Sequence, residues 1–462
     1  MTFGDDAGRD GPRRSRAIGN SSYCVVGGGI SGLTAAYRLR VAAGDDADIT
    51  LFDPADRLGG VLRTELVGAQ PMDLGAEAFV LRRPEMPALL AELGLADRQR
   101  TTTGVRPLIY SGGRLHPLPA DTVAGIPSSA ASVAGLVDDA TVARIEAEPG
   151  RTLNWTAGSD PAVAALVADR FGEQVVARSV DPLLGGVYAG SAATIGLRAA
   201  VPSVAAALDR GAASLTEAVR SGLPPAGGGP VFGSLEGGYR VLLDELVERA
   251  NIRWIRAGIS ALEPGWTLRD DTGACWQADA VVLAVPAAQV ARLVRAVAPR
   301  TSAAAAKIVT ASSVVVALAV PADTPFPDSS GVLVASGERL RAKAITLSSR
   351  KWGLRGGVQQ LRLSFGRFGD DLAARTSDDE LLGWALSDLV DVFDLSVELL
   401  DARVQRWIEA MPQYGPGHAD LIAELRAGLP PTLAVAGSYL DGIGVPACIG
   451  AAGRAVKHVM AP

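Results

Sequence analysis

The amino-terminal part of the chain alternates short apolar runs with a longer amphipathic stretch. Residues Tyr23 to Val26 form an apolar run rich in β-branched side chains, which predicts a buried strand. Glycines follow, and the sequence from near Ile30 predicts a helix. A second apolar run, Ile49 to Phe52, predicts the next strand. A strand, a glycine turn, a helix and a strand in this order indicate a Rossmann-like unit with parallel strands.

The rest of the chain changes to helical periodicity and then back to sheet-forming runs. The segment from Met86 to Leu95 has helical spacing. Between about 130 and 220 the sequence is rich in alanine and has apolar residues three and four positions apart, which predicts a helical region. From about 301 to 430 β-rich segments appear, and the final segment predicts a strand, a glycine-rich loop and a closing helix.

These patterns predict an α/β protein, α+β overall, with three parts. One is a discontinuous Rossmann-like domain, one is a β-rich domain and one is a helical lobe. The expected division is a disordered tail over 1–20, the Rossmann-like domain over 21–76, 224–300 and 431–462, the β-rich domain over 77–118 and 301–430, and the helical lobe over 119–223.

Composition narrows the classes of function. The chain has 462 residues and a net charge of −6, and it contains no basic run, which argues against a nucleic-acid partner. Three cysteines and three histidines are scattered, so no metal site is expected. The first 20 residues lack the apolar core of a signal peptide, and the longest apolar runs are too short to span a bilayer. We expect a cytoplasmic protein and leave a peripheral membrane contact open.

The glycine turn after the first strand has the chemistry of a phosphate site. Gly27, Gly29 and Gly32 have the G-x-G-x-x-G spacing, in which the backbone approaches a diphosphate at a helix N-terminus. Asp53 follows the second strand, 21 residues beyond Gly32, where an acid binds a ribose diol. The predicted nucleotide contacts are Gly27, Gly28, Gly29, Ile30, Ser31, Gly32 and Asp53.

A second glycine motif selects the dinucleotide. Arg57, Gly59 and Gly60 lie in the run DRLGG, which resembles the Asp-Arg-x-Gly-Gly run of the FAD superfamily that includes amine oxidases and carotenoid desaturases. In that superfamily the run lies along the phosphates of the flavin. The resemblance therefore implies FAD as the cofactor, an FAD domain for the Rossmann-like segments, and a substrate domain for the β-rich ones.

Four further segments resemble one branch of this superfamily, the porphyrinogen oxidases of haem synthesis, and most closely the bacterial coproporphyrinogen III type. They are residues 114–129, 179–203, 406–418 and 436–454, which include the runs PLLGGVYAG and MPQYGPGH. The resemblance implies an oxidoreductase that removes six hydrogens from coproporphyrinogen III, with dioxygen as the acceptor and hydrogen peroxide as a product. Enzymes of the haem pathway are then candidate partners.

The same resemblance implies where cofactor and substrate bind. Arg82 and Arg83 lie where relatives place a basic residue facing the substrate propionates, and no catalytic base stands out. The chain departs from relatives at Gly185, where a serine is common. The implied flavin contacts, beyond the two glycine motifs, are Gly75, Ala76, Glu77, Ile259, Trp407, Gly437, Gly442, Ile443, Gly444 and Val445.

Three alternatives stay open from the sequence. Protoporphyrinogen IX, a dicarboxylate, is the first alternative substrate. The second alternative is that the chain is an amine oxidase or desaturase of the same superfamily. The third is a non-catalytic flavin- or porphyrin-binding protein, although the intact glycine motifs favour a working cofactor site. The oligomeric state and the physiological electron acceptor are not indicated by the sequence.

Overall fold

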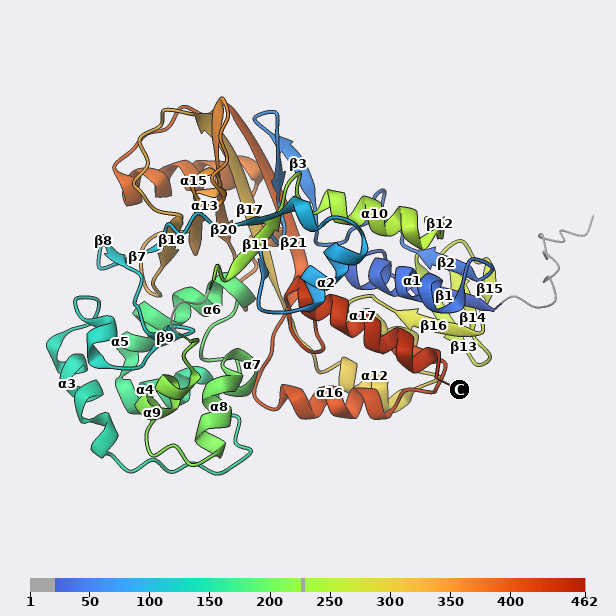
Figure 1. Ribbon diagram of the computed structural model, residues 1–462, viewed down its shortest axis with the longest axis horizontal. Helices are drawn as coiled ribbons and strands as arrows, with labels where there is room; N and C mark the ends of the chain where they lie inside the picture. The colour runs from blue at the N-terminus through green and yellow to red at the C-terminus, as the bar shows by residue number, and fades with distance from the viewer. Residues whose placement is uncertain (1–20, 226–228, 462) are drawn as a thin grey trace, which may run out of the picture.

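The computed structural model describes residues 21–225 and 229–461, so the expected disordered tail over 1–20 lies outside the described residues. Figure 1 shows three masses: a parallel sheet with its helices at the right, a larger sheet at the upper left and a group of helices at the lower left. The mixed α/β fold class is confirmed. Within the described ranges, no helix is long and apolar enough to cross a membrane.

The parallel sheet is assembled from distant parts of the chain. Its strands pair in the order β12-β2-β1-β16-β22, and all neighbours are parallel. Side chains alternate between two buried faces, which explains why the predicted strands read as continuous apolar runs. The strands are β1 (Ser22–Val26), β2 (Asp48–Phe52), β12 (Arg253–Ile255), β16 (Ala280–Leu283) and β22 (Leu433–Val435).

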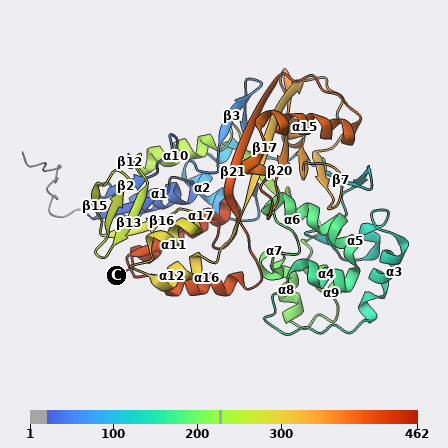
Figure 2. The same cartoon turned by 180° about the vertical axis from the view of Figure 1, so that it is seen from behind.

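Helices cover both faces of this sheet. One face packs against α1 (Ile30–Ala43), α10 (Arg240–Ala250) and α17 (Val445–Val459), which share one apolar core with it. The second core includes α11 (Ala287–Leu293), α12 (Pro299–Ala305), α16 (His418–Ala427) and a small sheet of β13 (Ile259–Glu263), β14 (Thr267–Asp270) and β15 (Cys275–Gln277). Figure 2 shows α11, α12 and α16 side by side. Thus α16 and most of α12, which come from the range 301–430, pack with the parallel sheet.

The larger sheet has seven strands in the order β21-β17-β20-β19-β18-β7-β8. On one face, alternating residues of β17 pack with α15 (Asp378–Phe393). On the other face, Ala317 and Ala319 pack against the hairpin of β3 (Thr64–Val67) and β4 (Gln70–Asp73). The strands are β7 (Leu108–Ser111), β8 (Arg114–Pro117), β17 (Thr310–Pro321), β18 (Gly331–Val334), β19 (Ala344–Thr346), β20 (Val358–Phe365) and β21 (Asp401–Pro412).

Short segments join these masses. The predicted helix over 86–95 is observed as α2 (Glu85–Glu92), which ends before Gly94. Strand β11 (Phe232–Leu235), in the range 224–300, pairs with β5 (Phe79–Val80) and β6 (Gln99–Thr101) instead of joining the parallel sheet. Strand β11, which follows the helical lobe in the sequence, is therefore held beside β5 and β6, which precede the lobe.

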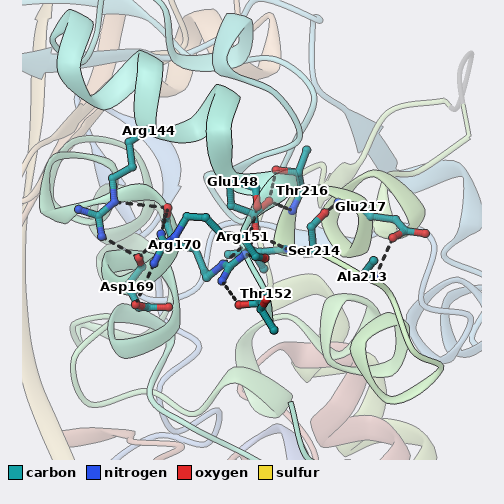
Figure 3. Close-up of polar contacts among 11 residues, drawn as sticks. Arg144, Glu148, Arg151, Thr152, Asp169, Arg170, Ala213, Ser214, Thr216 and Glu217 are labelled. Atoms are coloured by element: carbon teal, nitrogen blue, oxygen red, sulfur yellow. Dashed lines mark hydrogen bonds and ion pairs between the residues drawn. The ribbon is translucent and has the colours of Figure 1, made fainter. Parts of the chain in front are cut away.

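The helical region is confirmed, and one buried carboxylate ties it together. Glu148 accepts hydrogen bonds from the Leu215 and Thr216 backbone N–H groups and pairs with Arg170, whose side chain is also buried (Figure 3). An acid at the start of α9 also suits the helix dipole. The helices are α3 (Asp139–Ala147), α4 (Val163–Phe171), α5 (Glu173–Val175), α6 (Asp181–Tyr188), α7 (Leu197–Ala200), α8 (Pro202–Asp209) and α9 (Leu215–Gly222).

Candidate flavin site

The first glycine motif forms a tight turn between β1 and α1. Gly27 has a φ of 106°, and a Cβ there would lie 2.4 Å from the carbonyl oxygen of Ala284. A Cβ at Gly32 would lie 1.8 Å from the Gly27 carbonyl oxygen, so the helix can approach the strand only without a side chain. The N-cap of α1 is Gly29, which supplies no side-chain hydrogen bond, and the first turn contains no acid. The N-terminal N–H groups are thus available to an anion.

Asp53 and the second glycine motif lie against this turn. The Gly28 N–H donates to the Asp53 carboxylate at 2.6 Å, and the Gly59 N–H donates to the Gly28 carbonyl at 2.8 Å. Gly29 and Gly59 form a β-bridge. The Arg57 guanidinium donates to the carbonyl oxygens of residues 58, 60 and 62, so it holds its own loop in shape. The two motifs, predicted separately, form one surface at the carboxyl ends of the strands.

The carboxyl-terminal loop brings a second uncapped helix to this place. Gly444 is the N-cap of α17, again without a side-chain hydrogen bond or an acid in the first turn. Gly442 has a φ of 143°, which favours glycine, and a Cβ at Gly437 would lie 2.5 Å from the Tyr439 ring. Ile30 in the first turn of α1 and Val445 in the first turn of α17 belong to one apolar core. The first turns of the two helices therefore adjoin.

These features together fit a bound dinucleotide. Both helix N-termini lack a capping side chain and an acid, and a Cβ would fill the cradle at Gly27 and Gly32. Helix N-termini of this kind bind anions. The donors are backbone N–H groups, and the neighbouring carboxylate, Asp53, suits the hydroxyls of a ribose.

Gly75 lies where the second glycine motif meets the larger sheet. A Cβ at Gly75 would lie 1.9 Å from the Val61 carbonyl oxygen and 3.2 Å from the Trp407 ring. The Trp407 indole N–H donates to the Leu74 carbonyl at 2.8 Å. The Arg362 guanidinium, from β20, donates to the Gly75 carbonyl at 2.8 Å. Trp407 and Arg362 thus fix the path of the backbone at this position.

Glu77 forms a buried ionic group just after this segment. Its carboxylate accepts from the Ser348 hydroxyl at 2.5 Å and from Lys351 at 2.7 Å, and Arg362 lies 3.7 Å away. Burial raises the pKa of Glu77, but the positive charges of Lys351 and Arg362 and the hydrogen bonds outweigh it and lower the pKa to about 2. Glu77 is therefore a constant negative charge near neutral pH.

The pKa of Asp73, four residues earlier, is shifted in the opposite direction. Burial raises its pKa to about 7, although hydrogen bonds from the Thr64 hydroxyl and the Tyr239 backbone N–H oppose this. Neighbouring Glu77 adds to the increase. The pKa values of these two carboxyl groups are thus shifted in opposite directions, because Glu77 pairs with Lys351 and Arg362 whereas burial dominates at Asp73.

Other predicted site residues lie in different surroundings. Ile259 begins β13 and is buried in the core beside the parallel sheet. A Cβ at the preceding Gly258 would lie 3.9 Å from Pro54, which places the start of this strand beside the Asp53 loop. Ala76 is half-buried and packs at the edge of the first core.

Arg82 and Arg83 are exposed, and Arg83 pairs with Glu85 at 2.6 Å. None of the contacts found over residues 21–225 and 229–461 joins either arginine to Gly75 or Trp407. Their contact with substrate stays a prediction. Over the same ranges, no group of three or more histidines, cysteines or acids could hold a metal ion.

Sequence reasoning missed the basic residues in and beside the larger sheet, which are Arg362 of β20, Lys343 just before β19 and Lys351 of the helix α13 (Ser348–Trp352). Arg362 alternates with Leu361 and Leu363 in β20, so its period of two predicts an opposite face. The sequence does not show that this face meets Gly75, because the two segments are 287 positions apart. The sequence around Lys351 and Lys343 contains no motif that would mark either lysine as a site residue.

Comparisons with a family model and with known proteins show the family to which the chain belongs. The pattern described as flavin containing amine oxidoreductase matches residues 30–460. The chain is 74% identical over 443 residues to a coproporphyrinogen III oxidase of Mycobacterium leprae, which covers 95% of this chain and 98% of that protein. It is 75% identical over 439 residues to a coproporphyrinogen III oxidase of Mycobacterium tuberculosis, with 95% and 97% covered.

Among solved structures, a putative protoporphyrinogen oxidase from Exiguobacterium sp. 255-15 superimposes with a TM-score of 0.86 at 26% identity. It covers 96% of this chain and 99% of that chain. The arrangement of the three masses is therefore shared over nearly the whole length of both proteins.

Proposed function

Because the chain belongs to the flavin-containing amine oxidoreductase family, we propose that its flavin site oxidises coproporphyrinogen III to coproporphyrin III in haem synthesis. The observation that carries this proposal is the 74% identity, over 95% of the chain, to a coproporphyrinogen III oxidase. The likeness spans both glycine motifs, the larger sheet and the helical lobe, so it covers every part that could contact cofactor or substrate.

We propose FAD as the form of the flavin. The diphosphate is assigned to the uncapped N-terminus of α1, and the adenosine ribose to Asp53. The ring end is assigned to the loop over 442–445 at the start of α17, with Gly75 and Trp407 beside it. A chain with one glycine turn could hold a mononucleotide, but two adjoining helix N-termini suit a longer cofactor.

The flavin, when bound, supplies the acceptor for a hydride that leaves a carbon of the porphyrinogen. The residues of this chain hold and shield the reacting groups. Trp407 and Arg362 fix the carbonyl oxygens of Leu74 and Gly75. Glu77 neutralises Lys351 and thereby keeps the basic side chains of this face in place. Catalysis by positioning needs no dedicated general base, and none is assigned.

Dioxygen is proposed as the final electron acceptor. Removal of six hydrogens takes three two-electron cycles, and each cycle passes two electrons and two protons to dioxygen, which gives hydrogen peroxide. Protoporphyrinogen IX is the second candidate substrate, because the Exiguobacterium structure with the same arrangement is described as a putative protoporphyrinogen oxidase.

Steady-state turnover in air tests the assignment. The flavin-loaded protein is mixed with coproporphyrinogen III or with protoporphyrinogen IX, and porphyrin fluorescence and peroxide are followed together. We expect the larger kcat/KM with coproporphyrinogen III and three peroxides for each porphyrin. A larger kcat/KM with protoporphyrinogen IX would establish the second candidate instead, and porphyrin formation without peroxide would contradict dioxygen as the acceptor.

A further inference from the structure

Near the face of the larger sheet that carries Trp407 lie two cations that the flavin site does not use, the buried Lys343 and the half-buried Arg367. Ser313 of β17 pairs directly with Trp407 of β21, and its neighbour Val314 pairs with Phe365 of β20. Directly opposed residues of antiparallel strands share a face. Trp407 and Ser313 therefore lie on one face, and the end of β20 is two strands from Trp407, about 10 Å away.

Lys343 is the first of these cations, and it has no carboxylate partner. Its ammonium donates to the Gly366 carbonyl at 2.6 Å, the Ser313 hydroxyl at 3.2 Å and the Phe365 carbonyl at 3.4 Å. Burial lowers the pKa of Lys343 to about 7, the charge of Arg367 lowers it further, and Asp370 opposes the decrease. A buried charge without a counter-ion is costly.

Arg367 is the second cation, and its guanidinium is unpaired. Its side chain is half-buried beside α6, where a Cβ at Gly185 would lie 3.1 Å from its Nη1 atom. Within residues 21–225 and 229–461 the guanidinium forms no hydrogen bond or ion pair; only the Arg367 backbone N–H is engaged, with Asp370. The five N–H donors of this guanidinium thus have no protein acceptor within the described residues.

The two nearby carboxylates are already satisfied by other groups. Asp181 accepts from the Ala192 N–H at 2.7 Å and from the Ser336 hydroxyl at 2.8 Å. Asp370 accepts from the backbone N–H groups of Arg367 and Leu372. Neither carboxylate engages the guanidinium, so an additional anion could.

The junction lies where the larger sheet meets the helical lobe. The Phe368 N–H donates to the Ala189 carbonyl at the end of α6, and Gln413, just after β21, donates to the Tyr188 carbonyl. The end of α6 therefore meets the ends of two strands, β20 and β21, of which β21 carries Trp407. The next residue of α6, Gly186, is exposed, so this side of the helix is open to solvent.

We infer that the guanidinium of Arg367, supported by the charge of Lys343, binds one propionate carboxylate of the porphyrinogen at this junction. This inference rests on the proposed function. A planar guanidinium matches a carboxylate in a two-pronged hydrogen bond, and low solvent exposure strengthens it. The end of β20, two residues before Arg367, lies two strands or about 10 Å from Trp407, which is on the scale of a tetrapyrrole with its side chains.

The test compares the acid substrate with an uncharged one on the flavin-loaded protein. Arg367→Gln is assayed with coproporphyrinogen III and with its tetramethyl ester. A lost charge-assisted hydrogen bond corresponds to about a tenfold to hundredfold rise in KM for the acid, with kcat little changed. We expect no comparable change for the ester. Arg375→Gln, an exposed arginine paired with Asp371, is the matched control and should leave both KM values unchanged.

The outcomes separate the inference from the proposed function. If the wild-type protein does not oxidise coproporphyrinogen III, the proposed function is wrong. If it does, and Arg367→Gln has an unchanged KM or weakens acid and ester equally, the inference is overturned. If Arg367→Gln does not retain flavin, Arg367→Lys decides: a smaller rise in KM confined to the acid supports the inference, and an equal change for both substrates overturns it.

Discussion

The buried carboxylate of Glu77 gives the sharpest prediction of stability. The substitution Glu77→Gln keeps the size of the side chain and removes its charge. The amide would leave Lys351 without its ion pair at 2.7 Å and would weaken the interaction with Arg362 at 3.7 Å. Because Glu77 is buried, water cannot replace these interactions. We expect a clear loss of stability.

The magnitude follows from the pKa of the carboxyl group. The pKa falls from 4.5 to about 2 on folding, a difference worth about 3 kcal/mol at neutral pH. Breaking a buried ion pair typically costs about 3–5 kcal/mol, which agrees. Since the folded-state pKa is depressed, this stabilisation is present above the unfolded pKa and is lost as the pH falls through about 2. The difference between wild type and variant should therefore shrink below pH 4.5.

Thermal unfolding of the flavin-loaded proteins measures this effect. At neutral pH we expect Tm to fall by about 3 °C in Glu77→Gln, because the entropy of unfolding of a chain of this length is about 1 kcal/mol/K. Glu263→Gln is the control, because Glu263 forms an exposed pair with Arg269 at 3.3 Å, which is worth about 0–1 kcal/mol. Equal Tm values for wild type and Glu77→Gln, or a difference that grows on acidification, would refute the reasoning.

Two further predictions concern the cofactor cradle and the thiols. Gly32→Ala should abolish flavin loading, because its Cβ would lie 1.8 Å from a carbonyl oxygen, and the visible absorbance of the purified protein measures the loading. A Cβ at Gly453 would have no atom within 4 Å, so the control Gly453→Ala should bind flavin normally. Equal loading of the two variants would contradict the argument from close approach. Burial raises the pKa of Cys24 to about 12 and that of Cys448 to about 11, whereas Cys275 is exposed, so an alkylating reagent should label Cys275 alone in the native protein. Mass spectrometry showing early labelling of either buried thiol would count against this packing.

The sequence predicted the nucleotide half of the fold well because its signals are local. The glycine spacing and the apolar run before it each fall within a few residues, and Asp53 follows at the distance typical of this unit. In the structure the Asp53 carboxylate is beside Gly28, and the two glycine motifs bridge through Gly29 and Gly59. The helical periodicity over 130–220 is also a local signal, and it correctly predicted the helices of this range.

The substrate side was less predictable because its contacts join distant segments. Glu77 meets Lys351 across 274 positions, and Arg362 meets Gly75 across 287. Arg82 and Arg83 were singled out for their place beside a flavin segment, whereas the structure exposes them, half-buries Arg367 and buries Lys343. Residue type alone could not tell an exposed, paired arginine from a half-buried one without a protein partner.

Anaerobic mixing of the flavin-loaded protein with coproporphyrinogen III tests the central claim most directly. If the chain oxidises this substrate through its flavin, the visible flavin absorbance should bleach without air, and porphyrin fluorescence should reach completion once air is admitted. Bleaching should be slower with protoporphyrinogen IX. A flavin that stays oxidised in the presence of both substrates would contradict the account and would favour a protein that binds flavin or porphyrin without catalysis.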